Sequence, residues 1–204
     1  MLPRPVGHRA GVETMRRIVD GCIDLGIPYI TTYAFSTENK DRPKEEVGAL
    51  LGLIKDYFAS FLEDMLEKDM RVTTIGDLSY FPEDLRKIFY ESVEKSKNCK
   101  RGALNIALNY GSRSEILRAV NEAVKGGKEL DAEQFSRLLY TSDLPDPDLV
   151  VRTGGEKRLS NFMLYQSAYS EFYFSDTLWP DFGIDELGKI VENYSARERR
   201  FGKV

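Results

Sequence analysis

A group of basic and hydroxyl side chains follows a short apolar run late in the chain. The run Leu149–Val151, closed by two glycines, predicts a buried strand that ends in a glycine turn. Arg152 and Arg158 follow it, and Ser160-Asn161 predict the cap of a following helix. Arginine forks and helix N-termini both favour phosphate. The stretch therefore predicts a phosphate or diphosphate clamp. Taken singly, each of these side chains could instead be a solvated residue of a loop.

Further polar side chains follow an earlier apolar run. The sequence Ser36-Thr37-Glu38-Asn39 comes directly after the β-branched and aromatic stretch 28–35. For Ser36 or Thr37 alone, a helix cap leading to Pro43 is an equally good interpretation. Arg42 adds another anion-binding group, and several arginines around one site indicate more than one phosphate. The N-terminal residues Arg4, His8 and Arg9 are candidates for the same site.

The carboxylate Glu171 leaves two alternatives open. Glu171 precedes the aromatic run 172–174. It could hold Mg²⁺, which prefers carboxylates together with substrate phosphates, or it could be a solvent-exposed residue of an edge strand. The residues alone do not decide between these alternatives.

The elements that must position these side chains alternate between strand and helix. This alternation predicts an α/β fold with a central, mostly parallel sheet flanked by helices on both faces, in a single domain over residues 1–204. Ligands of such sheets bind at the carboxyl ends of the strands, where the polar groups lie. The expected strands are 28–35, 70–75, 103–109, 149–151 and 171–174, and the expected helices are 7–25, 43–68, 82–97, 112–124, 131–140, 161–168 and 184–195, after a loop over 1–6.

Composition excludes several classes of protein. The formal net charge of −4 argues against a broadly basic nucleic-acid binder. Two cysteines form neither a metal-binding spacing nor a disulfide framework, which indicates a reducing, cytoplasmic compartment. No apolar run reaches membrane-spanning length, so at most a peripheral membrane contact is expected. A single histidine excludes a site with several histidine ligands.

Five ordered motifs together resemble the cis-prenyltransferases, most closely the bacterial undecaprenyl diphosphate synthases. The resemblance covers nearly the whole chain, and its motifs are Gly7-His-Arg-Ala-Gly11, Tyr33-Ala-Phe-Ser-Thr-Glu-Asn39, Arg42-Pro43, Asn105-Ile-Ala-Leu-Asn-Tyr-Gly111 and Arg152-Thr-Gly-Gly-Glu-Lys-Arg-Leu-Ser-Asn-Phe162. It implies condensation of isopentenyl diphosphate with farnesyl diphosphate, aided by Mg²⁺. The product would be a Z-polyprenyl diphosphate such as undecaprenyl diphosphate, a lipid carrier for cell-wall synthesis, built in a hydrophobic tunnel with the helix over 43–68 as one wall.

The resemblance also implies roles for individual residues. Asn39 would assist proton removal as the catalytic residue, and Glu171 would contribute to the Mg²⁺ site by reaching across a homodimer interface. Arg200-Phe201-Gly202 resembles the family's C-terminal element. The remaining substrate-binding residues would be Arg152, Arg158, Leu159 and Ser160 for isopentenyl diphosphate, and Arg4, His8, Ser36, Thr37, Glu38 and Arg42 around the allylic diphosphate.

Three departures from the family pattern qualify these expectations. Lys40 stands where tryptophan is usual, and Lys157 stands where some members have histidine. The family's first strand and its Asp-Gly-Asn-x-x-Arg loop, which carries the principal Mg²⁺ ligand, would precede Met1. The expectation is that the chain is either truncated or a non-catalytic prenyltransferase subunit. An unrelated phosphate-binding α/β enzyme is the remaining alternative.

Overall fold

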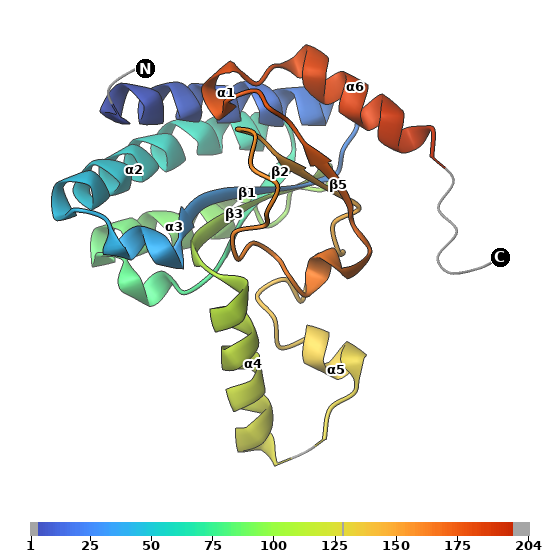
Figure 1. Cartoon of the computed structure of the whole chain (residues 1–204). Helices are drawn as coiled ribbons and strands as arrows, with labels where there is room; N and C mark the ends of the chain where they lie inside the picture. Colours follow the sequence, from blue (N-terminus) through green and yellow to red (C-terminus); the bar gives the residue numbers. More distant parts are fainter. Residues whose placement is uncertain (1–3, 128, 198–204) are drawn as a thin grey trace.

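The computed structural model describes residues 4–127 and 129–197, without the side chains of 4–6, 8, 9 and 59. Helices and strands alternate through most of this length (Figure 1). Short 3₁₀ turns, among them Thr37–Asp41 and Gln166–Tyr169, connect some of them. The elements are α1 (Arg4–Asp24), β1 (Tyr29–Ser36), α2 (Lys44–Glu67), β2 (Met70–Ile75), α3 (Glu83–Ser96), β3 (Gly102–Tyr110), α4 (Ser112–Gly126), α5 (Ala132–Ser136), β4 (Leu149–Arg152), β5 (Glu171–Phe174) and α6 (Ile184–Ser195).

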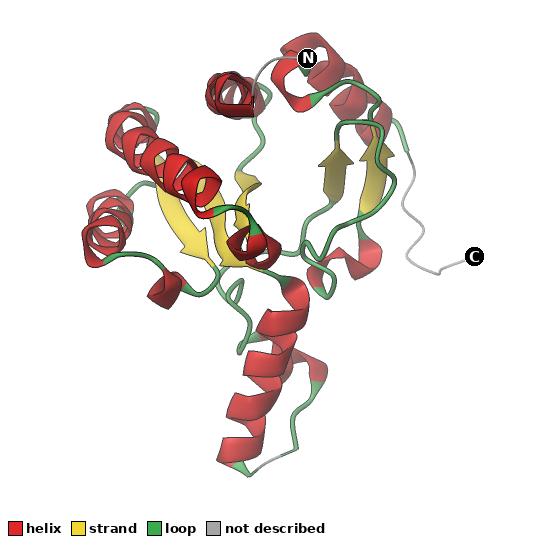
Figure 2. Ribbon diagram, turned by 60° about the vertical axis from the view of Figure 1, so that its left-hand side comes forward, coloured by secondary structure: helices red, strands yellow, loops and turns green. Residues whose placement is uncertain are grey.

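All of the strand pairs are parallel, which confirms the predicted fold class. β3 lies between β1 and β2, and β4 pairs with β5. All nine residues of β3 are buried, so both faces of the three-stranded sheet are covered at its centre. The strands nevertheless form two separate sheets, visible as two groups in Figure 2. Within the described residues β1 has a hydrogen-bonded neighbour on one side only, which leaves its outer edge unpaired.

One large apolar core joins the helices to the sheets. Val19, Phe61 and Phe89 bring α1, α2 and α3 into this core, and all three side chains are almost completely buried. Leu187 and Ile190 of α6 join the same cluster. α4 and α5 instead extend away from the rest of the molecule (Figure 1). α4 begins directly after β3, so its first turn lies at the carboxyl ends of β3 and of the paired strand β1. The candidate site is built around this point.

Three local predictions are wrong. The N-terminal loop over 1–6 is helical from Arg4, since a proline in the first turn has no amide that the helix needs. The helix over 131–140 is shorter, because only Ala132–Ser136 is α-helical. The helix over 161–168 does not form: Ser160, Asn161 and Met163 have positive φ angles of 49°, 64° and 45°, and only a 3₁₀ turn follows. An α-helix cannot include such left-handed residues.

Candidate active site

The loop after β1 is held by its own side chains. Asn39 Oδ1 accepts a hydrogen bond of 2.8 Å from the backbone amide of Ser36, and together they form a capping box around the turn Thr37–Asp41. Thr37 donates its hydroxyl proton to Glu38 at 3.0 Å. Capping is therefore confirmed as one role of Ser36. Because the loop is pinned in this way, it presents the half-buried Thr37 and the exposed Glu38 at the carboxyl end of the sheet.

The glycine turn after β4 doubles back in a left-handed conformation. Gly154 and Gly155 have φ angles of 88° and 75°, which only glycine adopts without steric cost. Their amides donate to Thr177 O and Ser175 O, both at 2.8 Å. Five of the ten positive φ angles in the described backbone fall within 154–163. Such concentrated strain is typical of functional loops. The loop presents Arg158 to solvent, where it pairs with Glu156 at 2.5 Å.

The two loops meet at Gly111, directly before α4. A Cβ atom on Gly111 would lie 2.4 Å from Thr37 Oγ1 and 2.6 Å from Asn161 Nδ2. Asn161 Nδ2 donates to Glu38 Oε1 at 2.8 Å, across 123 residues of sequence. The clamp and the loop after β1 are therefore in contact, although β4 and β1 belong to different sheets and the single sheet edge expected for both loops does not form.

Asn161 caps a helix, although not the one that was predicted. Its backbone oxygen accepts from the amide of Ser112 at 2.8 Å, and its Oδ1 accepts from the amide of Arg113 at 2.9 Å. Both amides belong to the first turn of α4, whose N–H groups have no partner within the helix. No α-helix directly follows Ser160, so none offers its N-terminus to a phosphate there as predicted. Asn161 instead links the clamp to the first turn of α4.

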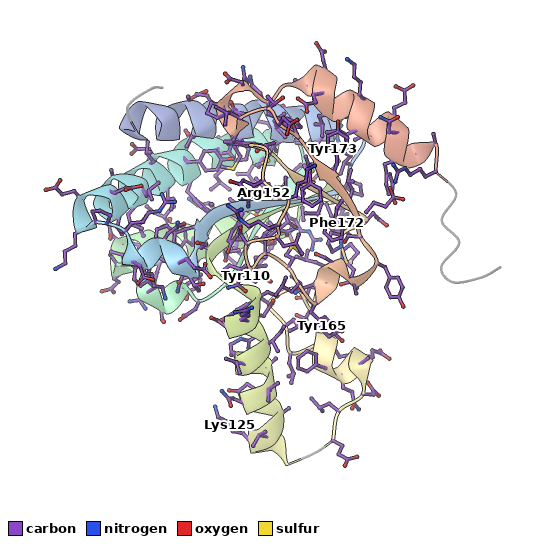
Figure 3. The ribbon with its side chains drawn as sticks, viewed as in Figure 1. Tyr110, Lys125, Arg152, Tyr165, Phe172 and Tyr173 are labelled. Atoms are coloured by element: carbon purple, nitrogen blue, oxygen red, sulfur yellow. The ribbon has the colours of Figure 1, made fainter. Side chains whose placement is uncertain are left out.

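Charges from both loops act on Tyr33, in β1. Burial raises the pKa of Tyr33 to about 12, and the negative charge of Glu38 adds to this while Arg152 opposes it. Arg152, the last residue of β4, lies centrally in the molecule (Figure 3). Burial by itself would raise the pKa of Glu38, but hydrogen bonds from Asn161, the backbone, Thr37 and Ser36 outweigh it and lower that pKa.

Replacing Asn161 with alanine is expected to raise the pKa of Glu38, because the strongest hydrogen bond to its carboxylate is lost while burial remains. Because the pKa of Glu38 is lower in the folded than in the unfolded state, its ionised carboxylate stabilises the fold at pH values above the unfolded-state pKa. This stabilisation is lost as the pH falls through the folded-state pKa. The variant should therefore lose less stability relative to wild type in acid than at pH 7. Carboxyl NMR titration and denaturation at both pH values measure this, and an unchanged Glu38 pKa would contradict it.

Other predicted site residues stand apart. Arg42 pairs with Glu46 at 2.9 Å on the first turn of α2. Glu171 begins β5 and faces Leu149 in the register, so it lies at the opposite end of the short sheet from Arg152. It pairs with Arg197 at 3.1 Å. Arg4 and His8 lie in α1, but their side chains are outside the described part of the structure, as are residues 200–202.

The two departing lysines take ordinary surface positions. Lys40 Nζ lies 4.8 Å from the ring centroid of Tyr80, a cation–π contact beside the loop after β1. Lys157 is exposed on the glycine loop. Both therefore add positive charge near the site without occupying its centre.

A metal site is incomplete in one chain. Among the described residues no group of three or more histidine, cysteine, aspartate or glutamate side chains gathers to bind a metal ion. Glu171 is a single carboxylate, already paired with Arg197. The described residues of one chain therefore do not form a closed Mg²⁺ site.

The aromatic face of α2 packs against the sheet. Tyr57 and Phe61 stack with ring centroids 4.5 Å apart, and Phe58 contacts Phe89 at 4.7 Å. This face packs closely against the strand residues Val72 and Ile106, and no space large enough for a water molecule remains between them. Tyr57 Oη is buried there without a hydrogen-bond partner. That this face of α2 forms the wall of a prenyl-chain tunnel stays a prediction.

Sequence reasoning missed what three residues do in the fold. Gly111 and Asn161 lie inside the recognised motifs, but only their contact in space reveals what they do. Glu115 was overlooked because an acidic residue in the first turn of a helix is normally a surface residue that complements the helix dipole. A signal did exist, since the helical spacing of α4 places Glu115 on the same side as the buried Ser112 and Ala119.

Comparison with known proteins identifies a family that matches this fold and site. A family described as putative undecaprenyl diphosphate synthase matches residues 1–202. The isoprenyl transferase of Clostridium perfringens is 47% identical over 210 residues, which cover 100% of this chain and 83% of that protein. The isoprenyl transferase of Aquifex aeolicus is 47% identical, with 100% and 88% covered. The fold and the matched family define this chain as a prenyltransferase. More specifically, it belongs to the undecaprenyl diphosphate synthase family of prenyltransferases.

Solved structures agree with this assignment. A probable undecaprenyl diphosphate synthase from Campylobacter jejuni has a TM-score of 0.85 and 38% identity, covering 96% of this chain and 93% of that one. Lavandulyl diphosphate synthase from Lavandula x intermedia, in complex with dimethylallyl diphosphate, has a TM-score of 0.94 and 33% identity, covering 99% and 90%. The chain is therefore similar to two solved proteins whose names give different products.

Proposed function

We propose that the protein condenses isopentenyl diphosphate with an allylic diphosphate, farnesyl diphosphate, to give a long Z-polyprenyl diphosphate such as undecaprenyl diphosphate. The observation that carries the proposal is the meeting of two loops at Gly111, joined by the 2.8 Å bond from Asn161 to Glu38. This contact brings the glycine-rich, arginine-bearing loop beside the polar loop after β1. Two adjacent polar loops provide one place for each diphosphate.

The two loops would divide the substrates between them. Arg152, Arg158 and Ser160, with the backbone at Leu159, hold isopentenyl diphosphate, because arginine forks match the geometry of phosphate oxygens. Ser36, Thr37, Glu38 and Arg42 surround the allylic substrate, and Arg4 and His8 are assigned to its diphosphate by the family resemblance. Asn39 orients the group from which the proton leaves. Fixing both reactants side by side lowers the entropic part of the barrier, and the apolar layer under α2 receives the growing chain.

Mg²⁺ is the cofactor that we propose from family membership, to neutralise the departing diphosphate. Glu171 is the carboxylate we assign to it, supplied to the site of a partner subunit. Its place at the amino end of β5 supports this, because within its own chain it is separated from the clamp. Its exposed neighbours Phe172 and Phe174 also indicate a surface that a partner covers.

A non-catalytic prenyltransferase subunit is the second candidate. Among the described residues no group of three or more histidine, cysteine, aspartate or glutamate side chains gathers to hold a metal ion, which favours it. We propose that residues 1–204 form a single prenyltransferase domain. Retention of Arg152 and Arg158 in an ordered site favours the enzyme.

The test is condensation by the full-length protein with labelled isopentenyl diphosphate, farnesyl diphosphate and Mg²⁺. A butanol-extractable product that grows with time and needs Mg²⁺ supports the enzyme, and its chain length identifies the product. Saturable binding of both diphosphates without any product would overturn the enzyme in favour of the non-catalytic subunit.

A homodimer is the assembly that we propose, formed in part by α4. Leu117, Val120 and Val124 are 63%, 41% and 72% exposed along one stripe of this helix. Beside them, a largely apolar cleft of about 630 Å³ lies between α4 and α5, with Phe135 and Tyr165 in its wall. Exposed apolar surface of this kind marks a protein interface.

Replacing Val124 with glutamate is expected to convert a dimer to a monomer, because a charge buried in an apolar interface has no partner there. The matched control is Lys125→Ala, on the charged side of the same turn, where Lys125 pairs with Glu122. Light scattering after size exclusion measures the mass of each variant. A wild-type monomer, or a dimer that tolerates the glutamate, would contradict this interface.

No helix in the described ranges, 4–127 and 129–197, is long and apolar enough to cross a membrane. A polyprenyl product is nonetheless poorly soluble in water, so we propose peripheral membrane contact in the cytoplasm during its release.

A further inference from the structure

A buried carboxylate joins three separate segments behind the candidate site. Glu115, in the first turn of α4, is only 1% exposed. Its Oε2 accepts hydrogen bonds from Tyr110 Oη at 2.6 Å and from Gln166 Nε2 at 3.1 Å. Its Oε1 accepts from the backbone amide of Tyr140 at 2.8 Å. A carboxylate at this depth is costly unless hydrogen bonds replace its hydration, and these three do so.

Each donor comes from a different part of the chain. Tyr110 ends β3, where that strand meets α4 (Figure 3). Tyr140 follows α5. Gln166 begins the 3₁₀ turn after the clamp loop, and its Nε2 also donates to Thr141 Oγ1 at 3.0 Å. Glu115 therefore connects the end of a central strand with the segment that follows the clamp.

The segment after the clamp runs along the first turn of α4. Asn161 caps the amides of Ser112 and Arg113 at 2.8 and 2.9 Å. The amide of Leu164 donates to Ser112 Oγ at 2.9 Å. The bond from Gln166 to Glu115 is the third attachment and the most buried, since Gln166 is only 1% exposed. These attachments are needed because the segment has left-handed residues and only a 3₁₀ turn to hold its shape.

We propose that Glu115 is a positioning residue, which fixes the clamp residues Arg158 and Ser160 in place for isopentenyl diphosphate. The inference rests on the proposed condensation activity. Glu115 touches neither substrate, since its hydrogen bonds all go to protein groups. Its effect passes through Gln166 to the clamp. The loop after β1 touches the clamp through the Asn161–Glu38 bond, but its own capping box also holds it. Loss of Glu115 should therefore affect isopentenyl diphosphate more than the allylic substrate.

Replacing Glu115 with glutamine tests this with almost no change in shape. The new amide group opposes the amide of Tyr140 in one orientation and Gln166 Nε2 in the other, where Gln166 keeps a bond only by turning its unpartnered Oε1 toward it. Gln166→Leu removes the attachment in either orientation and is therefore the decisive variant. The expected result is an increase of about tenfold in KM for isopentenyl diphosphate, with KM for farnesyl diphosphate unchanged within about twofold. Gln166→Leu removes the link from the other side and should give the same split. The double variant should be no worse than either single one, because both break the same attachment.

The matched control is Ser96→Ala. Ser96 is also fully buried and accepts from the amide of Val72 at 2.8 Å, but it lies between α3 and β2. The Ser96→Ala substitution should lower the denaturation midpoint and leave both KM values unchanged. Equal changes in both KM values, or a lower midpoint with neither KM changed, would show that Glu115 is merely structural.

Hydrogen exchange gives a readout that does not depend on catalysis. Amides of residues 159–167 should exchange about tenfold faster in Glu115→Gln, but not in Ser96→Ala. Should wild type form no product, this measurement would still decide the positioning role, and the proposed reaction alone would fail. Unchanged exchange in this segment would overturn the positioning role whatever the activity. If Glu115→Gln does not fold, Tyr110→Phe keeps the carboxylate, removes one donor and is expected to give a smaller split in KM.

Discussion

Replacing Arg158 with alanine is expected to raise KM for isopentenyl diphosphate by roughly ten- to a hundredfold while leaving folding stability unchanged, since a charge-assisted hydrogen bond contributes about 1.5–3 kcal/mol. The side chain is 62% exposed and pairs only with the nearby Glu156 among the described contacts. Exposed pairs of this kind contribute little to stability. The arginine is therefore available to a ligand without a structural penalty.

A matched control is Arg137→Ala. Arg137 is 69% exposed and pairs with Glu133 on α5, in a setting similar to Arg158 but away from the site. Steady-state kinetics with each substrate varied in turn, together with urea denaturation, separates binding from folding. If KM for isopentenyl diphosphate in the Arg158 variant equals that of the control, the clamp assignment is wrong.

Replacing Gly111 with alanine is expected to reduce condensation by about a hundredfold and to destabilise the fold by roughly 1–3 kcal/mol, because overpacking a tight contact forces its surroundings apart. The added methyl group would lie 2.4 Å from Thr37 Oγ1 and 2.6 Å from Asn161 Nδ2. Both positions are closer than a Cβ atom can approach, so the side chains of Thr37 and Asn161 must shift, which disturbs the Asn161–Glu38 bond that joins the two loops. Gly111 has an extended φ of −160°, so the effect comes from this contact and not from backbone strain.

Gly126→Ala, at the other end of α4, is the appropriate control. A Cβ there meets nothing within 4 Å. Alanine should therefore be neutral or stabilise the helix by up to about 1 kcal/mol. Thermal denaturation and product formation are measured for both variants. Wild-type activity in Gly111→Ala would show that the loops need not touch for catalysis.

The alternation of strands and helices was predictable because it depends on local patterns of apolar residues. β2, β5 and α6 were placed at their observed bounds, and both candidate loops were assigned to the carboxyl ends of strands. The helix over 161–168 failed for a physical reason. Asn161 gives its backbone oxygen and side chain to α4 and Glu38, and these distant contacts override local helical preference.

The sequence by itself determined the parallel α/β class, the residue types of a diphosphate clamp and the family resemblance, since each depends on local order along the chain. Only the tertiary structure decided which of those residues meet. It joined Glu38 to Asn161 through Gly111, separated Glu171 from Arg152 by the length of a strand, and buried Glu115 behind the clamp. Contacts across 123 residues depend on how sheets and helices pack, and no pattern of neighbouring residues encodes them.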